Sequence, residues 1–212
     1  MDVTDILREL SDAAAELVRR GLVLASGGNV SFRQGDVVYI SPTGSRLNAL
    51  SPELFAQVAF PTGESLNAFK PSSELPMHLA AYQVREEARV IIHCHPPHLI
   101  ALSALGWELP PMTADFFLYL NAERLPVVPY ITPGTEELAH AVAEKLGEAP
   151  AVILGNHGIL VTGPNVDKAL TRVLLAEEMA YIYLTARQFG EPRVLTAADW
   201  HALKASRYRQ TS

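Results

Sequence analysis

The strongest chemical signal in the sequence is the segment His93-Cys94-His95, which ends an apolar run that begins at Val90. Alternate residues of a β-strand point to the same face, so both imidazoles can converge on one metal ion while Cys94 points away. Two histidines at the end of a buried strand can equally well be hydrogen-bonded core residues. The pair alone therefore supports a metal site and a structural role about equally.

Two further residues favour the metal site. His157 lies between Gly155 and Gly158, and these glycines allow the backbone to bend and to approach a ligand closely. Glu74 falls in the first turn of an expected helix, where an ordinary carboxylate would also be favoured by the helix dipole. Three imidazoles and one carboxylate suit Zn²⁺, and a replaceable ligand is typical of catalytic zinc. His78, one turn after Glu74, is interpreted as packing or as a neighbour of the ligands.

Three turns are rich in small hydroxyl and amide residues: Gly28-Asn29, Thr43-Gly44 and Ser72-Ser73, the last at the start of a helix. Free backbone N–H groups, hydroxyls and the positive end of a helix can bind a phosphate group without a lysine. Each turn alone is an ordinary turn. A phosphate site requires that the three meet in space, which spacing alone does not establish.

Helices and strands that intermix along the chain must position these residues. Periodicity and turn residues predict strands at 30–33, 37–40, 57–60, 90–95, 127–130, 151–154 and 159–161. They predict helices at about 4–20, 74–84, 98–105, 135–146, 167–189 and 197–206, with no clear pattern from 106 to 125. Short turns join several adjacent strands, so the sheet should be antiparallel or mixed.

Composition limits the class of protein. The 212 residues include 17 Lys and Arg, 23 Asp and Glu and one cysteine, with a net charge of −6 and 49% hydrophobic residues. No linker interrupts the sequence, so a single domain over 1–212 with its own core is expected. The acidic balance disfavours nucleic acid as a partner, and no apolar run is long enough for a membrane span. The absence of a signal peptide and the lone Cys94 predict a cytoplasmic protein.

Five segments together resemble a known family, the class II sugar-phosphate aldolases typified by L-fuculose-1-phosphate aldolase. This superfamily also contains L-ribulose-5-phosphate 4-epimerase and the adducin head domain. The segments occur in the family's order and approximate spacing, within a resemblance that spans about residues 7–189. They are Ser26-Gly27-Gly28-Asn29-Val30-Ser31, Ser41-Pro42-Thr43-Gly44, Pro71-Ser72-Ser73-Glu74, His93-Cys94-His95 and Asn156-His157-Gly158.

The resemblance implies an α/β fold, a three-layer α/β/α sandwich around a mainly antiparallel sheet. It also implies a homotetramer with active sites at the subunit interfaces and one Zn²⁺ per chain. The implied metal ligands are Glu74, His93, His95 and His157. The implied phosphate-binding residues are Asn29, Thr43, Gly44, Ser72 and Ser73.

The implied reaction is the reversible cleavage of a ketose 1-phosphate, similar to L-fuculose 1-phosphate, to dihydroxyacetone phosphate and an aldehyde. Glu74 would then be the base that moves a proton at the donor carbon. The family's tyrosine proton donor has no clear counterpart, because Ala-Asp-Phe-Phe, containing Asp115, occupies that segment and resembles the epimerase pattern. Asp115 is therefore the candidate acid, followed by Tyr119 and Tyr208.

Two other functions follow in order. An epimerase or dehydratase acting on a related sugar phosphate is second, because Asp115 fits the epimerase while Glu74 stands where that enzyme has aspartate. A non-catalytic scaffold similar to the adducin head is third, because the sequence retains all four implied metal ligands.

Overall fold

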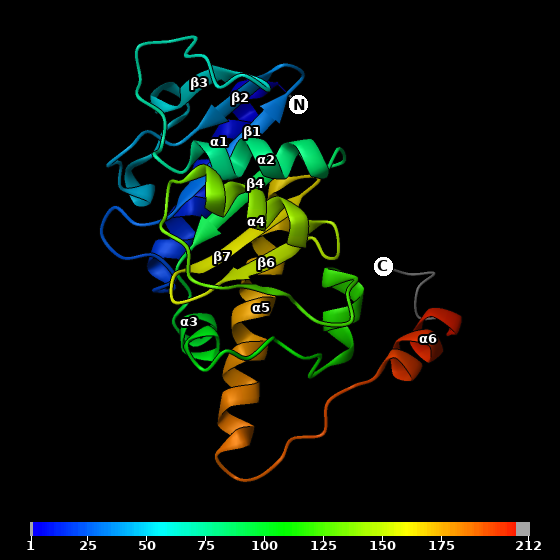
Figure 1. The fold of residues 1–212 in the computed structure, drawn as a ribbon. Coiled ribbons are helices and arrows are strands. Elements are labelled where there is room, and N and C mark those ends of the chain that lie inside the picture. The colour runs from blue at the N-terminus through cyan, green and yellow to red at the C-terminus, as the bar shows by residue number, and fades with distance from the viewer. Residues whose placement is uncertain (1, 207–212) are drawn as a thin grey trace.

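The computed structural model describes residues 2–206 and is built around a seven-stranded sheet (Figure 1). The strand order is β3-β2-β1-β4-β7-β6-β5, and every neighbouring pair is antiparallel except β5 and β6. The strands are β1 (Asn29–Gln34), β2 (Val37–Ile40), β3 (Ala56–Ala59), β4 (Val90–Cys94), β5 (Val127–Val128), β6 (Ala151–Leu154) and β7 (Gly158–Gly163). The prediction of a mainly antiparallel sheet is confirmed.

Helices cover both faces of the sheet, which confirms the three-layer α/β/α prediction. One apolar core joins the sheet to α1 (Val3–Arg19), α3 (Pro97–Ala104) and α5 (Val166–Arg187). A second core joins the opposite face to α2 (Leu75–Val84) and α4 (Glu136–Leu146). The last helix, α6 (Ala197–Ala205), lies at the periphery of the fold (Figure 1).

The central strand β4 explains how the fold positions a polar site inside an apolar sheet. Side chains alternate along it, so Val90, Ile92 and Cys94 enter the core of α1, α3 and α5. Ile91 enters the core of α2 and α4, and the alternation places His93 on that same face. Asn29 of β1 pairs with His93 across the ladder. Two polar side chains are therefore fixed side by side under α2.

Helix starts follow from their capping residues. The side chains of Asp2, Thr135 and Asn165 accept hydrogen bonds from backbone N–H groups at the starts of α1, α4 and α5.

The structure differs from the predicted elements in two places. It adds a π-helix at Phe116–Leu120, within the stretch where the sequence shows no clear pattern. It also shortens the predicted strand at 127–130 to Val127–Val128. No helix among the described residues is both long and apolar enough to cross a membrane.

Candidate active site

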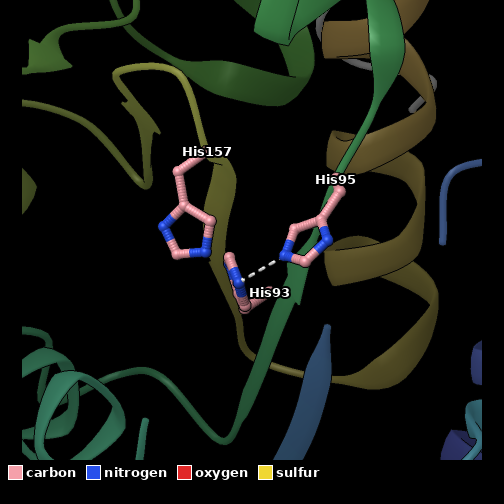
Figure 2. Close-up of side chains that lie close together, drawn as sticks. All are labelled: His93, His95 and His157. Atoms are coloured by element: carbon pink, nitrogen blue, oxygen red, sulfur yellow. Dashed lines mark hydrogen bonds between the residues drawn. The ribbon is translucent and has the colours of Figure 1, made fainter. Parts of the chain in front are cut away.

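Three histidines converge at the end of β4 (Figure 2). His93 lies on β4, His95 immediately after it, and His157 in the turn between β6 and β7. One ring nitrogen of each lies within 4.8 Å of the others. The Nε2 atoms of His93 and His95 are 3.1 Å apart. The turn thus adds a third imidazole to the pair that the strand spacing predicts.

Glu74, the residue that precedes α2, also lies in this cluster. Its Oε2 lies 3.1 Å from His93 Nε2, and its Oε1 lies 3.6 Å from His157 Nε2. The side chain is buried, at 8% exposure, although it carries a carboxylate. All four residues predicted as metal ligands are therefore close together in the structure.

The hydrogen bonds around His93 show that the cluster suits a cation. His93 Nδ1 lies 2.9 Å from the Ile159 carbonyl oxygen, which can only accept, so Nδ1 carries the hydrogen. The lone pair of His93 Nε2 then faces both His95 Nε2 and Glu74 Oε2 at 3.1 Å. A hydrogen on His95 Nε2 could be donated to His93 Nε2. The contact between His93 Nε2 and Glu74 Oε2 would still join two acceptors with no hydrogen between them. A cation bound between the groups would satisfy both.

A buried oxygen supports the same conclusion. Glu74 Oε1, which lies 3.6 Å from His157 Nε2, finds no hydrogen-bond partner within the described part of the chain. Buried polar atoms without partners are rare in native proteins. Imidazole nitrogens and a carboxylate oxygen are the donor set that Zn²⁺ prefers, so the residues present fit this ion.

Burial sets the charge of the cluster. It lowers the pKa of His95 and of His157 to about 4, and the neighbouring His93 lowers both further in the same direction. Burial alone would raise the pKa of Glu74, but the adjacent His93 and the hydrogen bond from Asn29 hold it well below its ordinary value. Near neutral pH the imidazoles of His95 and His157 are therefore neutral and the Glu74 carboxylate is ionised, as metal binding requires.

Two glycines allow the backbone to come this close. Gly28 has a φ of +69°, and a Cβ there would lie 2.8 Å from the His93 carbonyl oxygen. A Cβ on Gly158 would overlap the Cys94 carbonyl oxygen. Any side chain at either position would therefore push against the backbone of β4, which carries His93.

A cavity of about 120 Å³ opens beside the cluster. Glu74 and His95 line it, so it adjoins the candidate metal ligands. All five predicted phosphate-binding residues line it too: Asn29, Thr43, Gly44, Ser72 and Ser73. The three turns therefore meet in space, which the sequence could not establish.

Hydrogen bonding separates the donors that are free from those already used. The backbone N–H of Thr43 donates to the Lys70 carbonyl, and that of Ser72 donates to the Ser41 carbonyl. Within residues 2–206, the backbone N–H groups of Gly44 and Ser73 have no protein acceptor. An anion in the cavity can thus use these two amides together with the hydroxyls of the turns.

The candidate proton donors lie elsewhere. Asp115 is exposed just before the π-helix and does not line the cavity. Tyr119 is 37% exposed on the π-helix, and its carbonyl oxygen accepts a hydrogen bond from Arg172. Tyr208 lies outside the described residues. The structure of one chain therefore brings none of the described candidates to the histidine cluster.

Sequence reasoning missed a buried network behind the candidate metal ligands. His78 and Tyr82 of α2 contact Ser31 of β1, and His78 also contacts Asn29. A signal was present, because Glu74, His78 and Tyr82 follow one another at intervals of four and so share one helix face. Ser31 shares the strand face of Asn29 for the same kind of reason.

Comparisons with known proteins agree with this geometry. Residues 8–184 match the model of the class II aldolase and adducin N-terminal domain. A 5-deoxy-D-ribulose 1-phosphate aldolase of Bacillus thuringiensis is 34% identical over 85% of this chain and 84% of its own length. The L-fuculose phosphate aldolase of Escherichia coli is 32% identical over 91% of this chain and 88% of its own.

Solved structures give the same result. A structure of L-fuculose 1-phosphate aldolase superposes with a TM-score of 0.88 at 31% identity, covering 96% of both chains. A Klebsiella pneumoniae protein, described as an aldolase, epimerase or decarboxylase, also has a TM-score of 0.88 at 31% identity. It covers 96% of this chain and 99% of its own. The likeness in fold thus extends to a protein whose description leaves its reaction open among three classes.

Proposed function

The chain belongs to the class II aldolase and adducin family, and from this premise we propose that it is a zinc-dependent aldolase. Its proposed substrate is a ketose 1-phosphate similar to L-fuculose 1-phosphate, cleaved reversibly to dihydroxyacetone phosphate and an aldehyde. The observation that carries the proposal is the cavity that joins free amides and hydroxyls directly to Glu74 and His95. One cavity can thus hold a phosphate while the adjoining carbon atoms lie beside the metal-binding residues.

The proposed metal ligands are Glu74, His93, His95 and His157, with one Zn²⁺ per chain. When bound, zinc would supply a Lewis acid that stabilises negative charge on substrate oxygens. The phosphate group would accept hydrogen bonds from the amides of Gly44 and Ser73 and from the hydroxyls of Thr43 and Ser72. These contacts fix the position of C3 of the substrate.

Glu74 is the proposed acid and base at that carbon. When the bond between C3 and C4 breaks, the electron pair remains on the dihydroxyacetone phosphate half, and C3 must receive a proton. Glu74 is ionised at rest because its pKa is held well below the ordinary value, so it takes up a proton from solvent before it protonates C3 in cleavage. Its Oε1 has no hydrogen-bond partner among residues 2–206. In the synthetic direction Glu74 removes the proton from the same carbon.

Another group must accept the proton of the C4 hydroxyl as the aldehyde forms, and return it to the aldehyde oxygen in synthesis. If this group is Asp115, it must come from another chain. Because Asp115 is exposed and does not line the cavity of its own chain, we propose the family's homotetramer, with active sites at the subunit interfaces. In that assembly the carboxylate of one subunit would serve the site of its neighbour.

The test is a coupled assay for dihydroxyacetone phosphate with a panel of ketose 1-phosphates. Activity should disappear when a chelator removes the metal and return with Zn²⁺. The unphosphorylated ketoses should react far more slowly, because they lack the phosphate group that the amides and hydroxyls of the cavity would bind. No release of dihydroxyacetone phosphate from any ketose phosphate would refute the proposal.

An epimerase or dehydratase of a related sugar phosphate is the second candidate. Asp115 in its Ala-Asp-Phe-Phe context favours the epimerase, and the description of the similar Klebsiella protein includes an epimerase beside an aldolase and a decarboxylase. Conversion of L-ribulose 5-phosphate without cleavage would identify the epimerase, and loss of water from a sugar phosphate would identify the dehydratase.

A further inference from the structure

A continuous line of hydrogen bonds runs from the proposed base into the core beneath α2. Asn29 Nδ2 donates to Glu74 Oε2 over 2.8 Å, and Asn29 Oδ1 lies 2.5 Å from His78 Nε2. His78 Nδ1 lies 2.7 Å from Ser31 Oγ, which is 2.9 Å from the Tyr82 hydroxyl. His78, Ser31 and Tyr82 are fully buried, so water cannot replace these partners.

The direction of the protons follows from the end of the line at Glu74. An ionised carboxylate only accepts, so the amide nitrogen of Asn29 must face it and the amide oxygen must face His78. His78 therefore carries its hydrogen on Nε2 and donates it to Asn29. Its Nδ1 is then an acceptor, and it receives the hydrogen of Ser31 Oγ. From Ser31 to Glu74, every donor points toward the carboxylate.

We infer that His78 is a positioning residue for Glu74, acting through Asn29. The Nε2–H of His78 holds the Asn29 amide in the one orientation that presents N–H, and not C=O, to the carboxylate. An amide that turned over would place an oxygen against Glu74 Oε2 and repel it. His78 does not line the cavity, so it acts on the reaction only by orienting Glu74.

Electrostatics support this assignment. Burial lowers the pKa of His78 to about 3, with the nearby His93 acting in the same direction and Glu74 opposing it. The ring therefore stays neutral at physiological pH and keeps one donor and one acceptor. Residues behind metal ligands typically change metal affinity or activity by 10- to 100-fold when they are replaced.

The inference rests on the proposed role of Glu74 as metal ligand and base. Two replacements of His78 form a matched pair. Glutamine carries its amide nitrogen near the position of Nε2 and can still donate to Asn29, whereas asparagine is too short to reach it. Tyr82→Phe is the control, because it removes a buried hydroxyl from the far end of the line but leaves the donor to Asn29 in place.

The measurements are zinc affinity by competition with a chromogenic chelator, and kcat and KM at saturating zinc. We expect His78→Asn to weaken zinc binding about 10-fold or more and to lower kcat by a similar factor, with a smaller change in KM. His78→Gln and Tyr82→Phe should stay within about threefold of the parent protein in both quantities.

Three results would overturn the inference. These are parental zinc affinity and kcat in His78→Asn, a loss in His78→Gln as large as that in His78→Asn, and an equal loss in Tyr82→Phe. If His78→Asn does not fold, nitrogen NMR of the unaltered protein decides, because hydrogen on Nε2 supports the inference and hydrogen on Nδ1 overturns it. If the protein cleaves no ketose phosphate, the proposed function fails, while zinc affinity and the tautomer still test the positioning role.

Discussion

Acid should destabilise the zinc-free protein in part because the fold keeps His78 neutral. His78 is fully buried between α2 and β1, and its pKa falls from an ordinary 6.5 to about 3. The titratable groups that face it are Glu74 before α2, Tyr82 on α2 and His93 on β4. In the unfolded chain the ring takes up a proton as the pH falls through 6.5, whereas in the folded chain it does so only near pH 3.

The size of the effect follows from this difference. A group with a lowered folded pKa binds more protons when unfolded, so stability falls as pH falls from 6.5 toward 3. At pH 5 the ring is about 1.5 pH units below its unfolded pKa, and each unit corresponds to about 1.4 kcal/mol. His78 alone should therefore lower the free energy of unfolding by about 2 kcal/mol between pH 7 and pH 5.

The assay compares the parent protein with His78→Gln, which cannot take up the proton. Urea unfolding of both proteins at pH 7 and pH 5, with chelator and at one protein concentration, gives four free energies. The difference between the two pH responses isolates His78, because the other histidines and the assembly state affect both proteins alike. We expect the parent to lose about 2 kcal/mol more than the variant. Equal losses, within about 0.5 kcal/mol, would refute the argument that His78 is held neutral.

The remaining predictions concern the site itself. His95→Ala should lose both zinc and activity, as measured by metal analysis and the cleavage assay; full metal content would remove His95 from the ligand set. Ser72→Asp should keep zinc but raise KM by more than about 100-fold, because like charges about 4 Å apart repel by about 4 kcal/mol near a protein surface; an unchanged KM would argue against phosphate in the cavity. Asp115→Asn should lower kcat by roughly 10²- to 10⁴-fold, as expected for loss of a general acid, yet leave proton exchange into dihydroxyacetone phosphate largely intact. Glu74→Gln should abolish exchange and cleavage together, and normal cleavage by Asp115→Asn would make that carboxylate structural.

The sequence predicted the fold and the pairing of His93 with His95 from local rules. Strand alternation from Val90 onward placed these two histidines on one face, and the ordered motifs identified the family correctly and through it grouped Glu74 and His157 with them. Amphipathic periodicity also located α1 and α5 to within two residues at each end. These signals need no knowledge of contacts between distant segments.

Other features depend on contacts between distant segments, and the sequence did not predict them. The π-helix at Phe116–Leu120 packs on Trp200 of α6 and on α5, and no local periodicity indicates such a helix. The pairing of Ser31 with His78 joins residues 47 positions apart. The identity of the proton donor stays a prediction for a similar reason, since Asp115 would have to act in the site of another subunit.

The structure also changes how substitutions in the proposed phosphate cavity must be interpreted. Asn29 and Ser72 line the cavity, but both also hold Glu74: Asn29 donates to its carboxylate, and Ser72 Oγ accepts its backbone N–H. Removing either side chain therefore disturbs the proposed base as well as the anion site. A loss of activity in Ser72→Ala would not by itself measure phosphate binding. Ser72→Asp is more informative, because its carboxylate can still accept the N–H of Glu74 while it repels an anion, so the effect on KM separates from the effect on the base.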